Sequence, residues 1–71
     1  MKKYIYLALV DDDFVFNEEV KVYFKNKNIE ILNYYDKFNL LKLETPDQLF
    51  LDNLKFISHL ELEKEFKSQQ P

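Results

Sequence analysis

The stretch TPDQLFLDNLKFISHLELEKEF, residues 45–66, carries two signals that together decide the expected fold. Its first four residues match a capped helix start, with threonine as the N-cap, proline at the first helical position and glutamine at the third. Apolar residues then follow at helical spacing, which predicts a helix over residues 46–56. From Ser58 to Phe66 apolar residues alternate with glutamate, and this period of two predicts a half-exposed strand.

The residues upstream predict a strand, a helix and a second strand. Lys3–Val10 is an apolar, β-prone run of strand length. Apolar residues at helical spacing follow as far as Phe24, and we expect Asp13 to be the N-cap of this helix and Asn26–Asn28 to end it. Ile29–Tyr35 is a second β-prone run.

The segment between these two regions, Phe38–Leu43, fits either a short strand or a two-turn helix. As a strand it completes the order β-α-β-β-α-β, in which two β-α-β halves are joined through a hairpin. The expected fold class is therefore α+β: a ferredoxin-like βαββαβ sandwich, with a four-stranded antiparallel sheet and two helices on one face. We expect one small domain over residues 1–71, with residues 67–71 as a flexible tail.

Composition excludes several classes of function. The 71 residues are 46% hydrophobic, too apolar for a disordered chain, and no apolar run is long enough to span a membrane. All basic residues are lysines and the net charge is −3, so nucleic acid is not an expected partner. With no cysteine and one histidine, we expect no metal site and no cofactor. No convincing signal peptide begins the chain, so the expected location is cytoplasmic by default.

The chain also contains no glycine. Turns that need a positive φ must therefore use asparagine or aspartate, the next most tolerant residues. The candidates are Asn26, Asn28, Asp36, Asn39 and Asn53. Glycine loops that cradle phosphates are excluded.

Two polar motifs bear on catalysis. Asp11–Asp13 could hold Mg²⁺ at the end of a strand, but a solvated turn with a helix cap accounts for the same residues and is favoured. Ser58 and His59 are the residue types of nucleophilic catalysis, but neighbours on a strand point to opposite faces. We therefore expect a surface histidine and no enzyme activity.

The acidic residues of the last predicted strand have two interpretations. Glu61, Glu63 and Glu65 are expected to share one face of that strand. They either protect an exposed edge and promote solubility, or form a docking surface for a positive partner such as exposed helix N-termini. The sequence leaves both interpretations open.

Several motifs together resemble one known family. They are Tyr35-Asp36-Lys37-Phe38, Lys42–Leu49, Leu54 and Ile57–Glu61. This pattern is similar to that of the subtilisin-propeptide-like protease inhibitors, which have an aromatic strand, a helix opening with Lys-Leu-Thr/Ser-Pro-Glu-Gln-Leu and a closing strand. The resemblance implies the same βαββαβ sandwich.

The resemblance also implies a function. The exposed sheet face would pack on two helices of a subtilisin-like serine protease, and the C-terminal tail would enter the substrate cleft as an extended strand. The chain would then be a non-enzymatic inhibitor or propeptide-like chaperone module. The implied partner-binding residues are Glu61 and Glu63 on the docking surface, with Phe66, Lys67, Ser68, Gln69 and Gln70 as the tail.

A second resemblance leads to a different fold. Leu9–Asp13, Pro46–Asp52 and Leu60–Leu62 resemble parts of response-regulator receiver domains. This alternative implies phosphoryl transfer to Asp52, with Mg²⁺ held by Asp11 and Asp12. It requires a strand at Gln48–Asn53 and a helix at Leu60–Phe66. A third alternative is a ferredoxin-like interaction module that forms a homodimer through its sheet.

Overall fold

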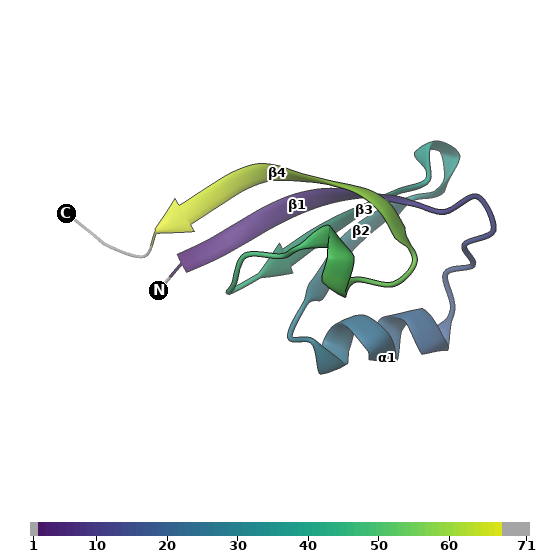
Figure 1. Cartoon of the computed structure of the whole chain (residues 1–71), viewed down its shortest axis with the longest axis horizontal. Helices are drawn as coiled ribbons and strands as arrows, with labels where there is room; N and C mark the ends of the chain where they lie inside the picture. The colour runs from purple at the N-terminus through teal and green to yellow at the C-terminus, as the bar shows by residue number, and fades with distance from the viewer. Residues whose placement is uncertain (1, 68–71) are drawn as a thin grey trace.

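A computed structural model describes the backbone of residues 2–67 and the side chains of residues 3–64 (Figure 1). The elements are β1 (Lys2–Val10), α1 (Glu18–Asn26), β2 (Glu30–Tyr35), β3 (Leu40–Thr45) and β4 (Ile57–Lys67), with short 3-10 turns η1 (Asp36–Phe38) and η2 (Leu51–Asn53). The strands form one sheet in the order β2-β3-β1-β4, and all neighbours are antiparallel. The α+β class and the four-stranded antiparallel sheet are therefore confirmed.

Helix α1 begins later than the sequence predicts. Its N-cap is Asn17, whose side-chain oxygen accepts a hydrogen bond from the N–H of Val20 at 3.1 Å. Asp13 is not the cap, because the chain turns at this point: the N–H of Phe14 donates to the carbonyl of Asp11 at 3.0 Å. The rings of Phe14 and Phe16 then pack side by side before the helix starts. The helix is nine residues long, and none of the helices in residues 2–67 is long and apolar enough to cross a membrane.

Asn28 ends helix α1 as the sequence predicts. Its φ of 62° is left-handed, a conformation that asparagine tolerates better than most residues. The N–H of Ile29 donates to the carbonyl of Phe24 at 2.9 Å, and the N–H of Asn28 donates to that of Lys25 at 3.0 Å. These two bonds form a Schellman motif, with asparagine at the position where glycine is usual.

The hairpin between β2 and β3 uses a second asparagine in the same way. Turn η1 is followed by Asn39 with a φ of 52°, and the chain then enters β3. In β3 the buried residues alternate with partly exposed ones, so the strand interpretation of residues 38–43 holds from Leu40 onward. The expected replacement of glycine by asparagine is confirmed at these two turns.

The predicted second helix over residues 46–56 is wrong. The hydroxyl of Thr45 does accept a bond from the N–H of Asp47 at 3.3 Å, as a helix cap would, but no α-helix follows. The segment runs in an irregular, largely extended path with the single turn η2. Two tyrosine hydroxyls accept its backbone N–H groups: Tyr6 from Leu49 at 3.1 Å and Tyr23 from Lys55 at 2.7 Å.

The distance that this segment must cover explains the missing helix. Thr45 lies opposite Tyr4 on β1, whereas Ile57 lies opposite Val10 at the other end of the same strand. The connection must therefore span about 20 Å along the sheet. Residues 46–56 as an α-helix would rise only about 16 Å and leave no residues for the turns at either end. An extended path is needed to close the sheet.

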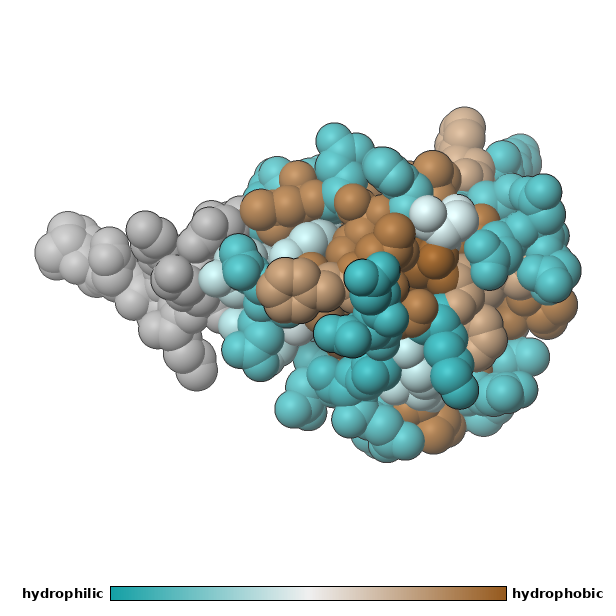
Figure 2. Space-filling view, viewed as in Figure 1, coloured by the Kyte–Doolittle hydropathy of each residue, from teal (hydrophilic) through white to brown (hydrophobic). Residues whose placement is uncertain are grey.

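The core lies between the sheet and one layer of connecting chain. Helix α1 and the 46–56 segment lie on the same side of the sheet (Figure 1). The buried cluster there comprises Tyr4, Tyr6, Ala8, Val10, Val20, Phe24, Ile29, Leu41, Leu43 and Ile57. In Figure 2 apolar side chains gather in the middle of the view, where the 46–56 segment crosses, and hydrophilic ones lie below them over α1.

The strand predicted from Ser58 to Phe66 is confirmed as part of β4, and its presence contradicts the receiver-like fold. That fold needs a helix at Leu60–Phe66 and a strand at Gln48–Asn53, but the first segment belongs to β4 and the second contains η2. Two register shifts interrupt the pairing of β4 with β1. At these bulges Ser58 and Glu63 have no residue of β1 directly opposite them. Immediately before β4, Phe56 has a φ of 73°, a left-handed conformation that is uncommon for a bulky residue.

Candidate partner-binding surface

One face of the sheet has no element of residues 2–67 packed over it (Figure 1). The antiparallel register sets three rows of residues across this face. The first row joins Tyr35, Leu40, Leu9 and His59; the second joins Asn33, Lys42, Leu7 and Glu61; the third joins Glu30, Glu44, Ile5 and Lys64. Because side chains alternate along each strand, these residues lie opposite the buried cluster.

Apolar side chains concentrate at one end of this face. We name Leu7, Leu9, Tyr35 and Leu40 the uncovered-face patch. Leu9 is 39% exposed and Tyr35 is 37% exposed, although both are paired with Leu40 of β3. Ile5 is only 6% exposed, yet it is not part of the core cluster. Its row neighbours Glu44 and Lys64 have aliphatic stems long enough to shield it from water.

Charged side chains lie toward the other end. The ammonium of Lys3 is 3.3 Å from a carboxylate oxygen of Glu44, and that of Lys42 is 3.8 Å from Glu63. The second pair reaches across β1, which places Glu63 on the uncovered face. Exposed pairs of this kind contribute little to stability, about 0–1 kcal/mol. Their main effect is to hold these charged side chains at defined positions on the uncovered face, where a partner would contact them.

The acidic residues of β4 do not simply alternate. Glu61 is exposed on the uncovered face opposite Leu7, and Glu63 lies at the bulge beside it. The bulge shifts the register, so Glu65 takes the position opposite Tyr4, a residue of the covered face. The regular alternation expected along these glutamates is therefore interrupted at Glu63.

The predicted tail divides between described and undescribed residues. Phe66 and Lys67 are the last two residues of β4 and pair with Lys3 and Lys2 of β1. They continue the strand, so the predicted tail does not begin at Phe66. Ser68, Gln69 and Gln70 lie outside the described residues.

The residues of the receiver alternative do not assemble into a metal site. Asp11 and Asp12 are exposed after β1, and Asp52 is exposed in η2. Within residues 2–67, no group of three or more acidic, histidine or cysteine side chains is arranged to hold a metal ion. The backbone N–H of Asp11 donates to the carbonyl of Phe56 at 3.1 Å, so this turn helps to anchor the start of β4.

His59 lies on the uncovered face, and Ser58 lies at the bulge next to it. The hydroxyl of Ser58 donates to the carbonyl of Leu9 at 3.3 Å, which satisfies a backbone group at the second bulge of β4. His59 is exposed opposite Leu9. Within the described residues, no hydrogen bond joins the side chains of Ser58 and His59.

The sequence analysis expected an exposed sheet face but did not identify the apolar residues of the uncovered-face patch, although a signal for them was present. Lys3–Val10 is apolar at nearly every position instead of at every second one. Such a run is typical of a strand that meets apolar surroundings on both faces. In this structure only one face of β1 packs against apolar residues of the core. The other face is therefore a candidate interface.

Comparison of the chain with protein-family models, with curated proteins and with solved structures gives no match.

Proposed function

We propose that this chain is a non-enzymatic protein-binding module: a propeptide-like inhibitor or folding assistant of a subtilisin-like serine protease. Its uncovered sheet face would dock on the protease. The observation that carries the proposal is the uncovered-face patch, which exposes the side chains of Leu9 and Tyr35 at one end of the uncovered sheet face. A sheet face of this kind is typical of an interface whose partner covers it.

The strand order supports the same proposal. The order β2-β3-β1-β4 with antiparallel neighbours is expected when two β-α-β halves are joined through a hairpin. We propose that the fold is a variant of the ferredoxin-like sandwich in which the 46–56 segment replaces the second helix. That replacement lies on the covered side of the sheet, so it leaves the proposed docking face unchanged.

The charges beside the uncovered-face patch favour one orientation of a partner helix on this face. Glu61 is exposed next to Leu7, without an ion-pair partner among the described side chains. A carboxylate in this position is suited to the positive N-terminal end of a partner helix. Glu63 already faces Lys42, so we expect it to contribute less. In the proposed complex β4 directs the following residues toward the substrate cleft.

An inhibition titration against a subtilisin-type protease tests the proposal. We expect the wild-type chain to inhibit hydrolysis of a small chromogenic substrate, and Leu9→Lys to weaken the inhibition at least tenfold by placing a charge in the apolar contact. Val22→Lys is the matched control, because Val22 is an exposed apolar residue of α1, on the other side of the sheet. Equal losses for both variants, or no inhibition by wild type at high micromolar concentration, would contradict the proposal.

The same apolar face also favours the homodimer alternative, and sedimentation separates the two. We expect a monomer at the concentrations used for inhibition. A dimer that Leu9→Lys dissociates, together with no effect on the protease, would assign the face to self-association instead.

A further inference from the structure

The sheet has a second feature that the proposed function does not use: the free edge of β2. Among the strands of residues 2–67, β2 is an outer strand and pairs with β3 alone. Neighbouring residues of an antiparallel strand alternate between directing their N–H and C=O toward the partner strand and away from it. Either Glu30 or Ile31 therefore directs both groups to the open side, where another strand can pair.

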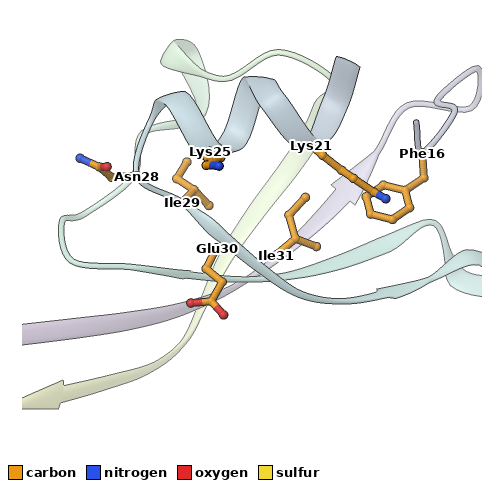
Figure 3. A pocket seen from close by; sticks show the side chains of 7 residues that line it. All are labelled: Phe16, Lys21, Lys25, Asn28, Ile29, Glu30 and Ile31. Atoms are coloured by element: carbon orange, nitrogen blue, oxygen red, sulfur yellow. The ribbon is translucent and has the colours of Figure 1, made fainter. Parts of the chain in front are cut away.

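A groove runs along this same edge, beneath helix α1. Its cavity volume is about 460 Å³, within the range of small binding sites. The apolar part of its wall is formed by Phe16, Ile29 and Ile31. Figure 3 shows Ile29 and Ile31 pointing toward the helix, whereas Glu30 points to the other side of the strand. A strand added to β2 would place every second side chain in this groove.

The helix side of the groove is positively charged. Lys21 and Lys25 line it from α1, one turn apart, and both side chains are exposed. The ammonium of Lys21 lies 5.5 Å from the centre of the Phe16 ring, so the charge lies directly beside the apolar wall. Because Glu30 points away, the carboxylate of that residue does not face these two lysines in Figure 3.

We propose that the β2 edge and the α1 groove together bind an extended segment of a partner protein whose apolar and acidic residues occupy every second position, so that both kinds of side chain lie on the face that enters the groove. The backbone of the segment would add a strand to β2, its apolar side chains would fill the space beside Phe16 and Ile31, and its carboxylates would reach Lys21 and Lys25. This is β-augmentation with charge complementarity. The free edge favours a peptide over a lipid, since a lipid would leave the edge unpaired.

The pairing has a defined end. The register of β2 shifts after Ile31, and the side-chain oxygen of Asn33 accepts a hydrogen bond from the N–H of Tyr34 at 2.9 Å. The bulge and this local bond make the second half of β2 a poor template for another strand. We therefore place the added strand along residues 29–32, where the groove also lies.

The test is an NMR titration of the isotope-labelled full chain with the blocked heptapeptide Val-Ser-Glu-Ser-Glu-Ser-Val, whose valines and glutamates all lie on one face when it is extended. We expect saturable shifts at Ile29, Ile31 and Lys21, and cross-strand NOEs between the peptide backbone and residues 30–32. The double variant Lys21→Gln and Lys25→Gln should weaken binding at least tenfold at low salt. The control pair Lys37→Gln and Lys55→Gln removes the same charge elsewhere and should leave the affinity unchanged.

Three outcomes would overturn the proposal. If the same peptide with lysine in place of both glutamates binds as tightly, charge recognition by Lys21 and Lys25 is excluded. Decanoate that binds at the groove as tightly as the peptide, with no contacts to the β2 edge, would make it a site for small amphipathic acids. The chain could also associate with itself in the absence of peptide as its concentration rises. If the chemical shifts of β2 and β4 then change together, the partner of the β2 edge is a second copy of the chain.

Discussion

The hydroxyl oxygen of Tyr6 accepts a hydrogen bond from the backbone N–H of Leu49 at 3.1 Å. Tyr6 is buried in β1, and Leu49 belongs to the segment that takes the place of the predicted second helix. The bond therefore ties an irregular stretch of chain to the centre of the sheet. It also supplies a partner for a phenol that is buried on the covered face.

Replacing Tyr6 by phenylalanine should cost about 1 kcal/mol of unfolding free energy, because the N–H of Leu49 loses its partner while the ring stays in place. Urea unfolding followed by circular dichroism measures the loss. The amide of Leu49 should also exchange with solvent faster in Tyr6→Phe. Tyr34→Phe, which removes a hydroxyl on β2, is the control and should leave exchange at Leu49 unaltered.

Tyr23 holds the far end of the same segment. Its hydroxyl accepts from the N–H of Lys55 at 2.7 Å and lies 3.4 Å from the carbonyl of Asn53. Tyr23→Phe should raise hydrogen exchange at Lys55 and leave Leu49 protected. If exchange at Lys55 is unchanged, the extended path does not depend on this hydroxyl.

The N-cap assignment gives a direct test of where α1 begins. Asn17→Ala should destabilise the fold by about 1 kcal/mol, because the N–H of Val20 loses its side-chain acceptor. Asn17→Asp should retain the stability. Asp13→Ala should change stability by less than about 0.5 kcal/mol, since Asp13 is an exposed residue before the helix. A larger loss for Asp13→Ala than for Asn17→Ala would show that the helix begins earlier.

Asn39 should be sensitive to alanine and tolerant of glycine. Its φ of 52° costs alanine about 1 kcal/mol, whereas glycine adopts it without a steric penalty. Thermal unfolding should therefore rank Asn39→Gly at or above wild type and Asn39→Ala below it. Asn26→Ala, inside α1, is the control and should be neutral or slightly stabilising.

The sequence predicted most elements of the fold because their signals were local. The alternation from Ser58 to Phe66 matched β4, and the absence of glycine led to the left-handed asparagines at positions 28 and 39. The second helix was wrong although its start signal was strong, and the hydroxyl of Thr45 does make a cap-like bond. The length of the connection decided against the helix, and that length depends on which ends of β3 and β4 must be joined.

The candidate surfaces were less accessible to sequence reasoning. Glu61 lies on the uncovered face, but the bulge at Glu63 has no signal in the alternating pattern. In the sequence, Lys21 and Lys25 carry no signal that distinguishes them from other charged residues of an amphipathic helix. Their position beside Phe16 and the β2 edge follows only from how α1 packs on the sheet. The left-handed Phe56 could not have been predicted, because tertiary contacts with Phe14 and Tyr23 hold its ring.

The most direct measurement is a methyl NMR titration of the labelled chain with an inactive subtilisin variant whose catalytic serine is alanine. Docking through the uncovered face predicts shifts or broadening at Ile5, Leu7, Leu9 and Leu40, while the core methyls of Val20 and Leu43 stay in place. No change at several hundred micromolar protease, or changes confined to α1 and residues 46–56, would contradict the proposed function.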